Sequence, residues 1–249
     1  MPYQLRKDEL DMYQSIVDKY YMKPVILKIS EAIGEKGILQ TFDYLHPIFL
    51  STKESVDVLL EARKAKGEIK DVSQARKSVV GSMFSNCIVY LFLEAKKSGF
   101  VNTNIFVTNK TNDLRFKKMI TILVDGETQK PDMDLLFYSE NEELAIHKCM
   151  IMSLKTSLRE RAGQTYKWKL LMEIALGESA LKDKYNITYN PDQMPLVCFA
   201  TINFYNEINN PQHKGMFKFF DESFIGKPIH SDFISNLSTI VKFANSKLL

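Results

Sequence analysis

The chain has 249 residues, 45% of them hydrophobic and 25% charged, and its formal net charge of +3 permits a nucleic-acid partner without arguing for one. Its three cysteines lie far apart, each inside an apolar run, so we expect buried reduced thiols and no structural zinc site. The charged N-terminus has no apolar segment of a secretory signal, and no run approaches the roughly 18 apolar residues that a membrane span needs. We therefore expect a soluble, cytoplasmic protein without a membrane partner.

The first 98 or so residues are predicted to be helical. Apolar side chains recur there at three- and four-residue spacing, at Leu5, Leu10, Tyr13, Ile16, Val17 and Tyr20. A second helix is expected from Pro24 to about Gly34. Pro47 interrupts the apolar run that follows, so Ser51 or Thr52 is expected to cap a third helix. This region contains no catalytic constellation, and we expect it to serve dimerisation or DNA contact.

A long helix is predicted over residues 72–97. Its apolar positions are Val79, Val80, Met83, Phe84, Cys87, Ile88, Leu91 and Phe92, and Ser98-Gly99 is expected to end it. Gly81 lies inside this pattern, where a glycine costs about 1 kcal/mol relative to alanine. A close backbone approach would rationalise it.

The strands are expected after this helix. Residues 101–107 and 119–124 are predicted as short strands with a polar, basic loop between them, and Asp125-Gly126 as a turn. Residues 135–138 and 144–154 are predicted to pair as an antiparallel hairpin. After a central helix, residues 196–204 and 216–220 are further strand candidates. Ser231 or Asp232 is expected to start a last helix through Phe243.

Chemistry concentrates at the hairpin. Because side chains alternate along a strand, Asp132 and Asp134 should share one face, and Ser153 and Lys155 should share a face of the second strand. If the strands pair, both sets converge at one end of the sheet. Carboxylate-held Mg²⁺ can neutralise a phosphoryl group and activate water, and a lysine there can stabilise developing negative charge. The alternative is that residues 131–134 form an ordinary turn into a strand.

A polar run follows the lysine: Lys155, Thr156, Ser157, Leu158, Arg159, Glu160 and Arg161, with Gln164 three residues on. Arginine forks can donate to guanine and a carboxylate can accept from cytosine, so this run is suited to reading base edges. The alternative is a helix start at which Glu160 complements the helix dipole and both arginines are solvated.

Together these residues resemble the PD-(D/E)XK superfamily of metal-dependent nucleases, and most closely type II restriction endonucleases. The run from Lys155 to Arg161 is similar to the Lys-Thr-Ser-Leu-Arg-Glu-Arg segment of BsaWI-like enzymes, which cut CCGG or interrupted CC…GG sites. The resemblance implies a mixed central sheet flanked by helices, an α/β (α+β) nuclease core. It also implies base or phosphate contacts by Thr156, Ser157, Arg159, Glu160, Arg161 and Gln164.

The resemblance also implies a metal site. In the superfamily the first acid and an acid-x-Lys pair hold Mg²⁺ with the intervening backbone carbonyl, here that of Leu154. By this comparison Asp134 is favoured as the primary acid and Asp132 as its partner, while Ser153 replaces the second acid. In similar Ser-x-Lys enzymes the missing acid comes from the next helix, but Lys167 and Trp168 occupy those positions. Glu173 is the next acid and is kept as a weaker metal-ligand candidate.

A second family pattern fails at its acid. Residues 76–88 resemble a Lys-Ser-x-x-Gly-x-x-Phe-Glu helix whose glutamate can help to bind metal. Here Ser85 and Asn86 stand where that glutamate would be.

We therefore predict a Mg²⁺-dependent type II site-specific deoxyribonuclease acting on double-stranded DNA. A helical region at residues 1–70 and a nuclease core at residues 71–249 are expected. Two strands must be cut at a palindromic site, so we expect a homodimer, with a cognate DNA methyltransferase as genetic partner. The alternatives are a structure-specific repair nuclease of the same fold and a non-catalytic DNA-binding protein.

Overall fold

The computed structural model describes residues 3–204 and 206–249, and in helix α7 it describes the backbone but not the side chains of residues 159–164. A six-stranded mixed sheet in the order β1-β4-β5-β7-β8-β9 forms the centre. Its strands are β1 (Ile105–Thr108), β4 (Leu135–Glu140), β5 (Ile146–Lys155), β7 (Leu196–Thr201), β8 (Glu222–Ile225) and β9 (Ser235–Asn236). Strands β1, β4 and β5 are antiparallel neighbours, whereas β5, β7, β8 and β9 run parallel. The predicted α/β class with a mixed sheet flanked by helices is confirmed.

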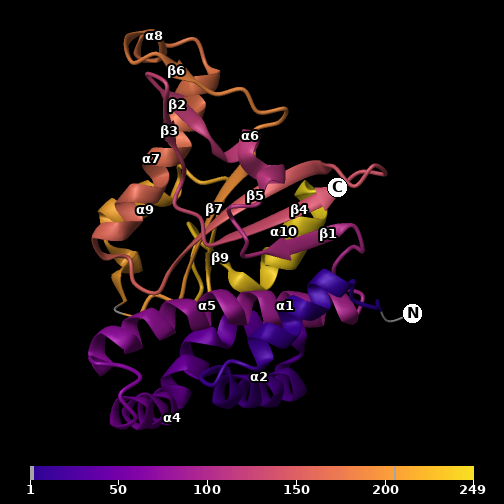
Figure 1. The fold of residues 1–249 in the computed structure, drawn as a ribbon, viewed down its shortest axis with the longest axis vertical. Coiled ribbons are helices and arrows are strands. Elements are labelled where there is room, and N and C mark those ends of the chain that lie inside the picture. Colours follow the sequence, from indigo (N-terminus) through magenta and orange to yellow (C-terminus); the bar gives the residue numbers. More distant parts are fainter. Residues whose placement is uncertain (1–2, 205) are drawn as a thin grey trace.

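The N-terminal helices cover one face of this sheet (Figure 1). They are α1 (Lys7–Val17), α2 (Met22–Lys36), α3 (Ile38–Thr41), η1 (Phe42–Tyr44), α4 (Leu45–Ala65) and α5 (Val72–Lys97). The expectation that Pro47 interrupts the chain and that Ser51 or Thr52 starts a helix is wrong. Helix α4 already begins at Leu45, because proline is tolerated in the first helical turn, where the N–H has no intrahelical partner.

Helix α5 lies directly against the sheet and confirms the predicted bounds. Asp71 caps its start by accepting hydrogen bonds from the N–H groups of Ser73 and Gln74, and Gly99, with a φ of 82°, follows its end. By length and mean hydropathy alone, α5 could cross a membrane, although it has no uninterrupted run of 18 apolar residues. However, 67% of its most apolar window is buried inside the protein, as in a core helix. A Cβ at Gly81 would meet nothing within 4 Å, so no close approach explains this glycine.

Alternation along the strands divides the apolar side chains between two cores. Leu135, Met152 and Leu154 face the N-terminal helices, whereas Leu136 and Ile151 face the opposite side. There the covering helices are α7 (Arg159–Leu176) and α9 (Pro211–Phe217), and the last helix, α10 (Ile240–Lys247), belongs to the first core. The first core joins side chains from both sides of the predicted boundary at residue 70, which itself stays a prediction.

Two expectations near the C-terminus are wrong. Residues 216–220 were expected to form a strand, but Met216 and Phe217 end helix α9, which Asn210 caps and Pro211 opens. The last helix does not begin at Ser231 or Asp232, because β9 and the short helix η4 (Leu237–Thr239) precede α10. Strand β8, at Glu222–Ile225, takes the place next to β7.

A small second sheet projects from the side of the molecule opposite the N-terminal helices (Figure 1). It pairs β3 (Glu127–Gln129), β2 (Ile122–Val124) and β6 (Ile187–Thr188), with η2 (Leu114–Phe116), α6 (Lys117–Ile120) and α8 (Ala180–Lys184) beside its strands in sequence. The predicted turn at Asp125-Gly126 is confirmed, because both residues have a positive φ, as a two-residue hairpin turn requires. The strands predicted at 101–107 and 119–124 are shorter, beginning at Ile105 and Ile122.

Candidate active site

The antiparallel pairing of β4 with β5 confirms the predicted hairpin and places Asp134 beside the end of β5. The backbone N–H of Asp134 donates to the Met152 carbonyl at 3.0 Å. Its carboxylate oxygen Oδ2 accepts the N–H of Leu154 at 2.7 Å, taking the place of a backbone carbonyl of a neighbouring strand. One hydrogen bond thus holds the Asp134 backbone against Met152, and a second holds its carboxylate against the N–H of Leu154.

Lys155 ends β5 and brings both aspartates together. Its Nζ lies 2.7 Å from Oδ2 of Asp132 and 3.5 Å from Oδ2 of Asp134. The two aspartates precede β4, which begins at Leu135, so the expectation that they lie on the strand is wrong. The convergence expected from that idea nevertheless occurs, because the chain entering β4 runs alongside the end of β5.

The electrostatics of the cluster are those of two carboxylates that share one cation. Burial raises the pKa of Asp134, while the neighbouring Lys155 and the hydrogen bond from Leu154 act in the opposite direction. The Lys155 side chain is only 12% exposed, whereas Asp132 is 43% and Asp134 36% exposed. The carboxylates are therefore open to a ligand and the ammonium group is held behind them.

The residues fit a divalent cation in part. Carboxylate and carbonyl oxygens are the ligands that Mg²⁺ prefers, and Asp132, Asp134 and the Leu154 carbonyl would supply them. Among the residues that the structure describes, no three His, Cys, Asp or Glu side chains gather in a way that could hold a metal. Mg²⁺ usually keeps several waters and binds through one or two carboxylates plus substrate phosphates, so a site with two acids is compatible with it.

Ser153 and Glu173 do not join the two aspartates. The Ser153 side chain is fully buried, and its Oγ lies 3.3 Å from Oγ1 of Thr165 on α7. Glu173 contacts Lys169 at 3.6 Å, and Lys169 is held at 2.7 Å by Asp221. Asp221 also accepts the N–H of Val197, which stands opposite Ile151, about 13 Å along β5 from Lys155.

The predicted base-reading residues are only partly described. Thr156 and Ser157 are half-buried in the short connection between β5 and α7. Arg159, Glu160, Arg161 and Gln164 lie outside the described side chains, although the backbone that carries them forms the start of α7. All six residues lie within ten positions of Lys155 in the sequence. The proposed catalytic lysine and the proposed base-contacting residues therefore belong to one continuous segment, from the end of β5 to the start of α7.

The Asn86 side chain is buried in helix α5 and forms two hydrogen bonds. Its Oδ1 accepts from Lys19 Nζ at 3.0 Å and its Nδ2 donates to the Tyr21 hydroxyl at 3.1 Å. Both partners lie in the turn between α1 and α2. Asn86, one of the two residues that stand where the family pattern has its glutamate, therefore packs within the helical region.

The loop that follows β7 also contacts the connection after Lys155, and the sequence patterns did not predict this contact. The N–H of Phe204 donates to the Thr156 carbonyl at 3.1 Å, and Glu207 Oε2 accepts the N–H of Leu158 at 2.7 Å. The available signal was the asparagine-rich run of residues 203–210, since asparagine tolerates the left-handed backbone of tight turns.

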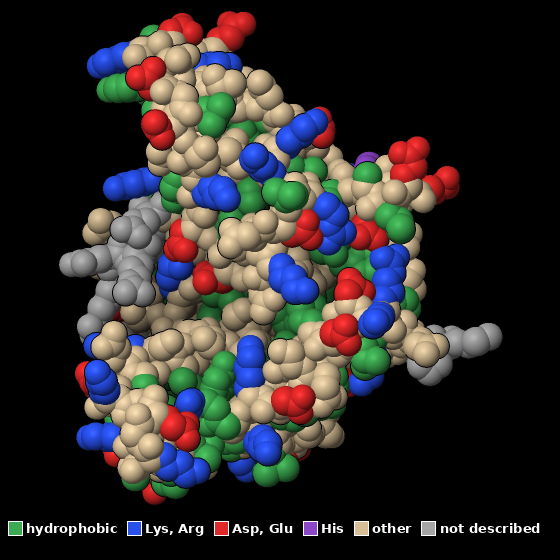
Figure 2. All heavy atoms as spheres, in the orientation of Figure 1, with side chains coloured by type: hydrophobic (Ala, Val, Ile, Leu, Met, Phe, Trp, Pro, Cys, Tyr) green, Lys and Arg blue, Asp and Glu red, His purple; other side chains and the backbone are tan. Residues whose placement is uncertain are grey.

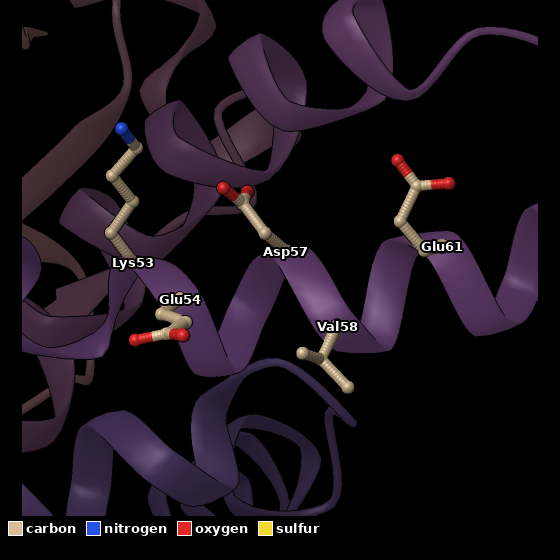
Figure 3. Close-up of a pocket in the computed structure, with 5 residues that line it drawn as sticks. All are labelled: Lys53, Glu54, Asp57, Val58 and Glu61. Carbon is tan, nitrogen blue, oxygen red and sulfur yellow. The ribbon is translucent and has the colours of Figure 1, made fainter.

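A hollow on the described surface lies apart from the aspartate–lysine cluster. A hollow beside α4 is lined by side chains of that helix alone, Lys53, Glu54, Asp57, Val58 and Glu61 (Figure 3). No residue of β4, β5 or α7 contributes to its lining. Figure 2 shows acidic and basic side chains interspersed over one face of the molecule, in keeping with the small net charge.

Comparison with known proteins gives one family. A family model described as BsaWI restriction endonuclease type 2 matches residues 108–246, which is more than half of the chain. The matched range contains Asp132, Asp134, Lys155 and the loop after β7, and it leaves out α1 to α5. A search of the curated proteins finds no match.

Proposed function

The chain belongs to the BsaWI family of type 2 restriction endonucleases, which implies binding and cutting of double-stranded DNA, and from this membership we propose a Mg²⁺-dependent mechanism of the PD-(D/E)XK type. The observation that carries the proposal is the cluster of Asp132, Asp134 and Lys155 at the end of the β4–β5 pair. In this proposal the two aspartates and the Leu154 carbonyl hold the metal.

Each side chain of the cluster has a distinct role in the proposed reaction. Bound Mg²⁺ would supply charge neutralisation at the phosphoryl group and a more acidic water. Asp134, fixed by Leu154, acts as the primary acid, and Asp132 is its partner. Lys155 orients the attacking water and stabilises the negative charge that develops on the phosphoryl oxygens.

We propose that recognition starts at the neighbouring helix. Arg159 and Arg161 would donate to guanine edges, Glu160 would accept from cytosine N4, and Thr156, Ser157 and Gln164 would contact bases or phosphates. Sites of the CCGG or CC…GG type follow from the resemblance of this run. A palindromic site mirrors a two-fold axis, so a homodimer with two active sites is proposed, with the N-terminal helices as its contact or as a clamp on DNA.

Two further parts of the proposal concern the cell. An enzyme that cuts specific sites must be kept from its host's DNA, so a methyltransferase gene is expected beside this one. A restriction enzyme must also meet incoming DNA, so a cytoplasmic location is proposed as well.

The missing acid at Ser153 favours one rival, a non-catalytic DNA-binding protein, and the shared fold favours another, a structure-specific repair nuclease. A panel of duplex, nicked and branched DNA of the same sequence content, incubated with Mg²⁺, separates the three. We expect duplexes to be cut at fixed sequences whether or not they carry a branch. Cutting directed by branches or nicks would favour the repair nuclease, and tight binding without cutting would favour the binding protein.

A further inference from the structure

The connection from Lys155 to α7 forms hydrogen bonds with the loop that follows β7. Leu158 stands at the N-cap of α7, and its apolar side chain cannot accept the hydrogen bonds that the first N–H groups of a helix offer. The Leu158 side chain is itself fully buried. The N-cap side chain therefore supplies no acceptor to the start of α7.

Glu207 supplies such an acceptor. Its Oε2 lies 2.7 Å from the Leu158 nitrogen, 49 residues away in sequence. Two residues before Leu158, the Thr156 carbonyl accepts the N–H of Phe204 at 3.1 Å. These two bonds hold both sides of Ser157. A carboxylate at a helix start is also favoured by the helix dipole, and its hydrogen bonds to N–H groups are stronger than those of a neutral acceptor.

Hydrogen bonds within the chain also hold the backbone of Asn203 and Glu207. Asn203 is buried with a φ of 49°, and its N–H donates to the Thr201 hydroxyl at 2.9 Å. Asn203 Oδ1 in turn accepts the N–H of Glu207 at 2.8 Å, and the Glu207 carbonyl lies 2.9 Å from Nδ1 of His213. The backbone of Glu207 is thus fixed on both sides before its carboxylate reaches α7.

We propose that Glu207 is a positioning residue for sequence recognition, which fixes the start of α7 and with it the backbone of residues 159–161. This inference rests on the proposed function, in which that helix start carries the base-reading side chains. Displacement of reactive or recognition groups by about 1 Å can cost roughly 10²-fold. Losing the Glu207 contact should therefore reduce discrimination between DNA sites more than it reduces binding to DNA of any sequence.

The experiment compares wild type, Glu207→Ala and Glu207→Gln. For each, kcat and KM are measured on a cognate duplex and on duplexes altered at one base pair, beside the melting temperature. We expect Glu207→Ala to lower the ratio of cognate to altered kcat/KM by about 10–100-fold. Glu207→Gln, which keeps the shape but not the charge, should lower it less. Binding to unrelated DNA without metal should stay within about two-fold, because phosphate contacts dominate that binding.

Asp221→Ala is the matched control. Asp221 also accepts a backbone N–H, that of Val197, at 2.7 Å, but it does so at the other end of the parallel strands. Its loss should lower the melting temperature and leave the discrimination ratio unchanged. If Glu207→Ala behaves like this control, the inference is overturned while the proposed function stands. If Glu207→Ala does not fold, the ratio for Glu207→Gln decides in the same way, and a wild type that cuts no duplex overturns both proposals.

Discussion

Replacing Lys155 with alanine is expected to reduce the rate of DNA cleavage by about 10³-fold while DNA binding is retained. The Lys155 Nζ lies 2.7 Å and 3.5 Å from the two carboxylates, and it is the cation of the proposed site. Removing one group that stabilises charge in a transition state typically costs about 10²–10³-fold in kcat. The loss of Lys155 also leaves two neighbouring carboxylates without their shared counter-charge. Single-turnover cleavage with Mg²⁺ measures this effect without contributions from product release.

Lys148→Ala is the control for Lys155→Ala. Lys148 lies on the same strand, β5, near its start, where its side chain contacts the carbonyl of Leu249. The control should cleave at the wild-type rate. Cleavage by Lys155→Ala within a few-fold of wild type would remove this lysine from the mechanism. A loss of activity accompanied by unfolding, seen as a lower melting temperature, would assign it a structural role.

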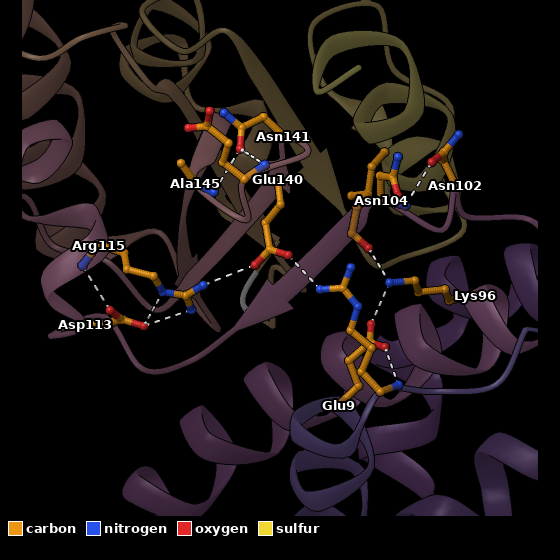
Figure 4. A network of polar contacts seen from close by, with 12 residues as sticks. Glu9, Lys96, Asn102, Asn104, Asp113, Arg115, Glu140, Asn141 and Ala145 are labelled. Atoms are coloured by element: carbon orange, nitrogen blue, oxygen red, sulfur yellow. Dashed lines mark hydrogen bonds and ion pairs between the residues drawn. The ribbon is translucent and has the colours of Figure 1, made fainter.

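The largest expected effect on stability comes from Glu9, which forms a buried ion pair with Lys96 (Figure 4). The Lys96 Nζ lies 2.6 Å from Glu9 Oε1 and 2.7 Å from the Ile105 carbonyl, and its side chain is fully buried. Removing one partner of a buried pair leaves an uncompensated charge and costs about 3–5 kcal/mol. Glu9→Gln should lower the free energy of unfolding by that amount, measured by urea denaturation at pH 7.

An exposed pair of the same length serves as the control. Lys28 and Glu31 also lie 2.6 Å apart, but their side chains are 42% and 49% exposed. Exposed pairs contribute about 0–1 kcal/mol, so Glu31→Gln should change stability little. Equal losses in Glu9→Gln and Glu31→Gln would contradict the buried-pair account.

The same lysine predicts a pH dependence. Burial lowers the pKa of Lys96 from 10.5 to about 8, against the attraction of Glu9. Between these two values the unfolded chain binds more protons than the folded protein, so the contribution of Lys96 to stability rises with pH from about 8 towards 10.5. In Glu9→Gln the rise should begin at a lower pH, because the attraction that favours the charged lysine is gone.

The site was predictable where local patterns and a short tertiary contact coincide. Leu135–Tyr138 and residues 149–152 of β5 are continuously apolar, and the acidic turn of residues 139–143 lies between them. Their pairing therefore follows from hydrophobic pattern and proximity in sequence. That pairing is enough to bring Asp132 and Asp134 to Lys155. The aspartates themselves precede β4, so strand alternation does not explain their contact with Lys155, although the contact itself was predicted.

Two features could not be predicted from the sequence: the helix at residues 216–217 and the contact of Glu207 with Leu158. Met216–Phe220 is a short apolar run, and periodicity alone cannot tell such a run from a buried piece of helix. The decisive signal was the Asn210-Pro211 pair, a cap followed by a helix-opening proline. Glu207 is one acid among many on the chain. Only the parallel pairing of β5 with β7 brings it to Leu158, and that pairing is set by long-range packing.

The most direct test of the central claim is digestion of phage DNA by the wild-type protein and by Asp134→Asn, each with Mg²⁺ and with excess EDTA. We expect discrete fragments from the wild type with Mg²⁺ and intact DNA with EDTA. Asp134→Asn should cleave at least about 10²-fold more slowly, whereas Asp192→Asn, an exposed control, should match the wild type. Intact DNA from the wild type with Mg²⁺, or undiminished cleavage by Asp134→Asn, would contradict the assignment of this cluster as the active site.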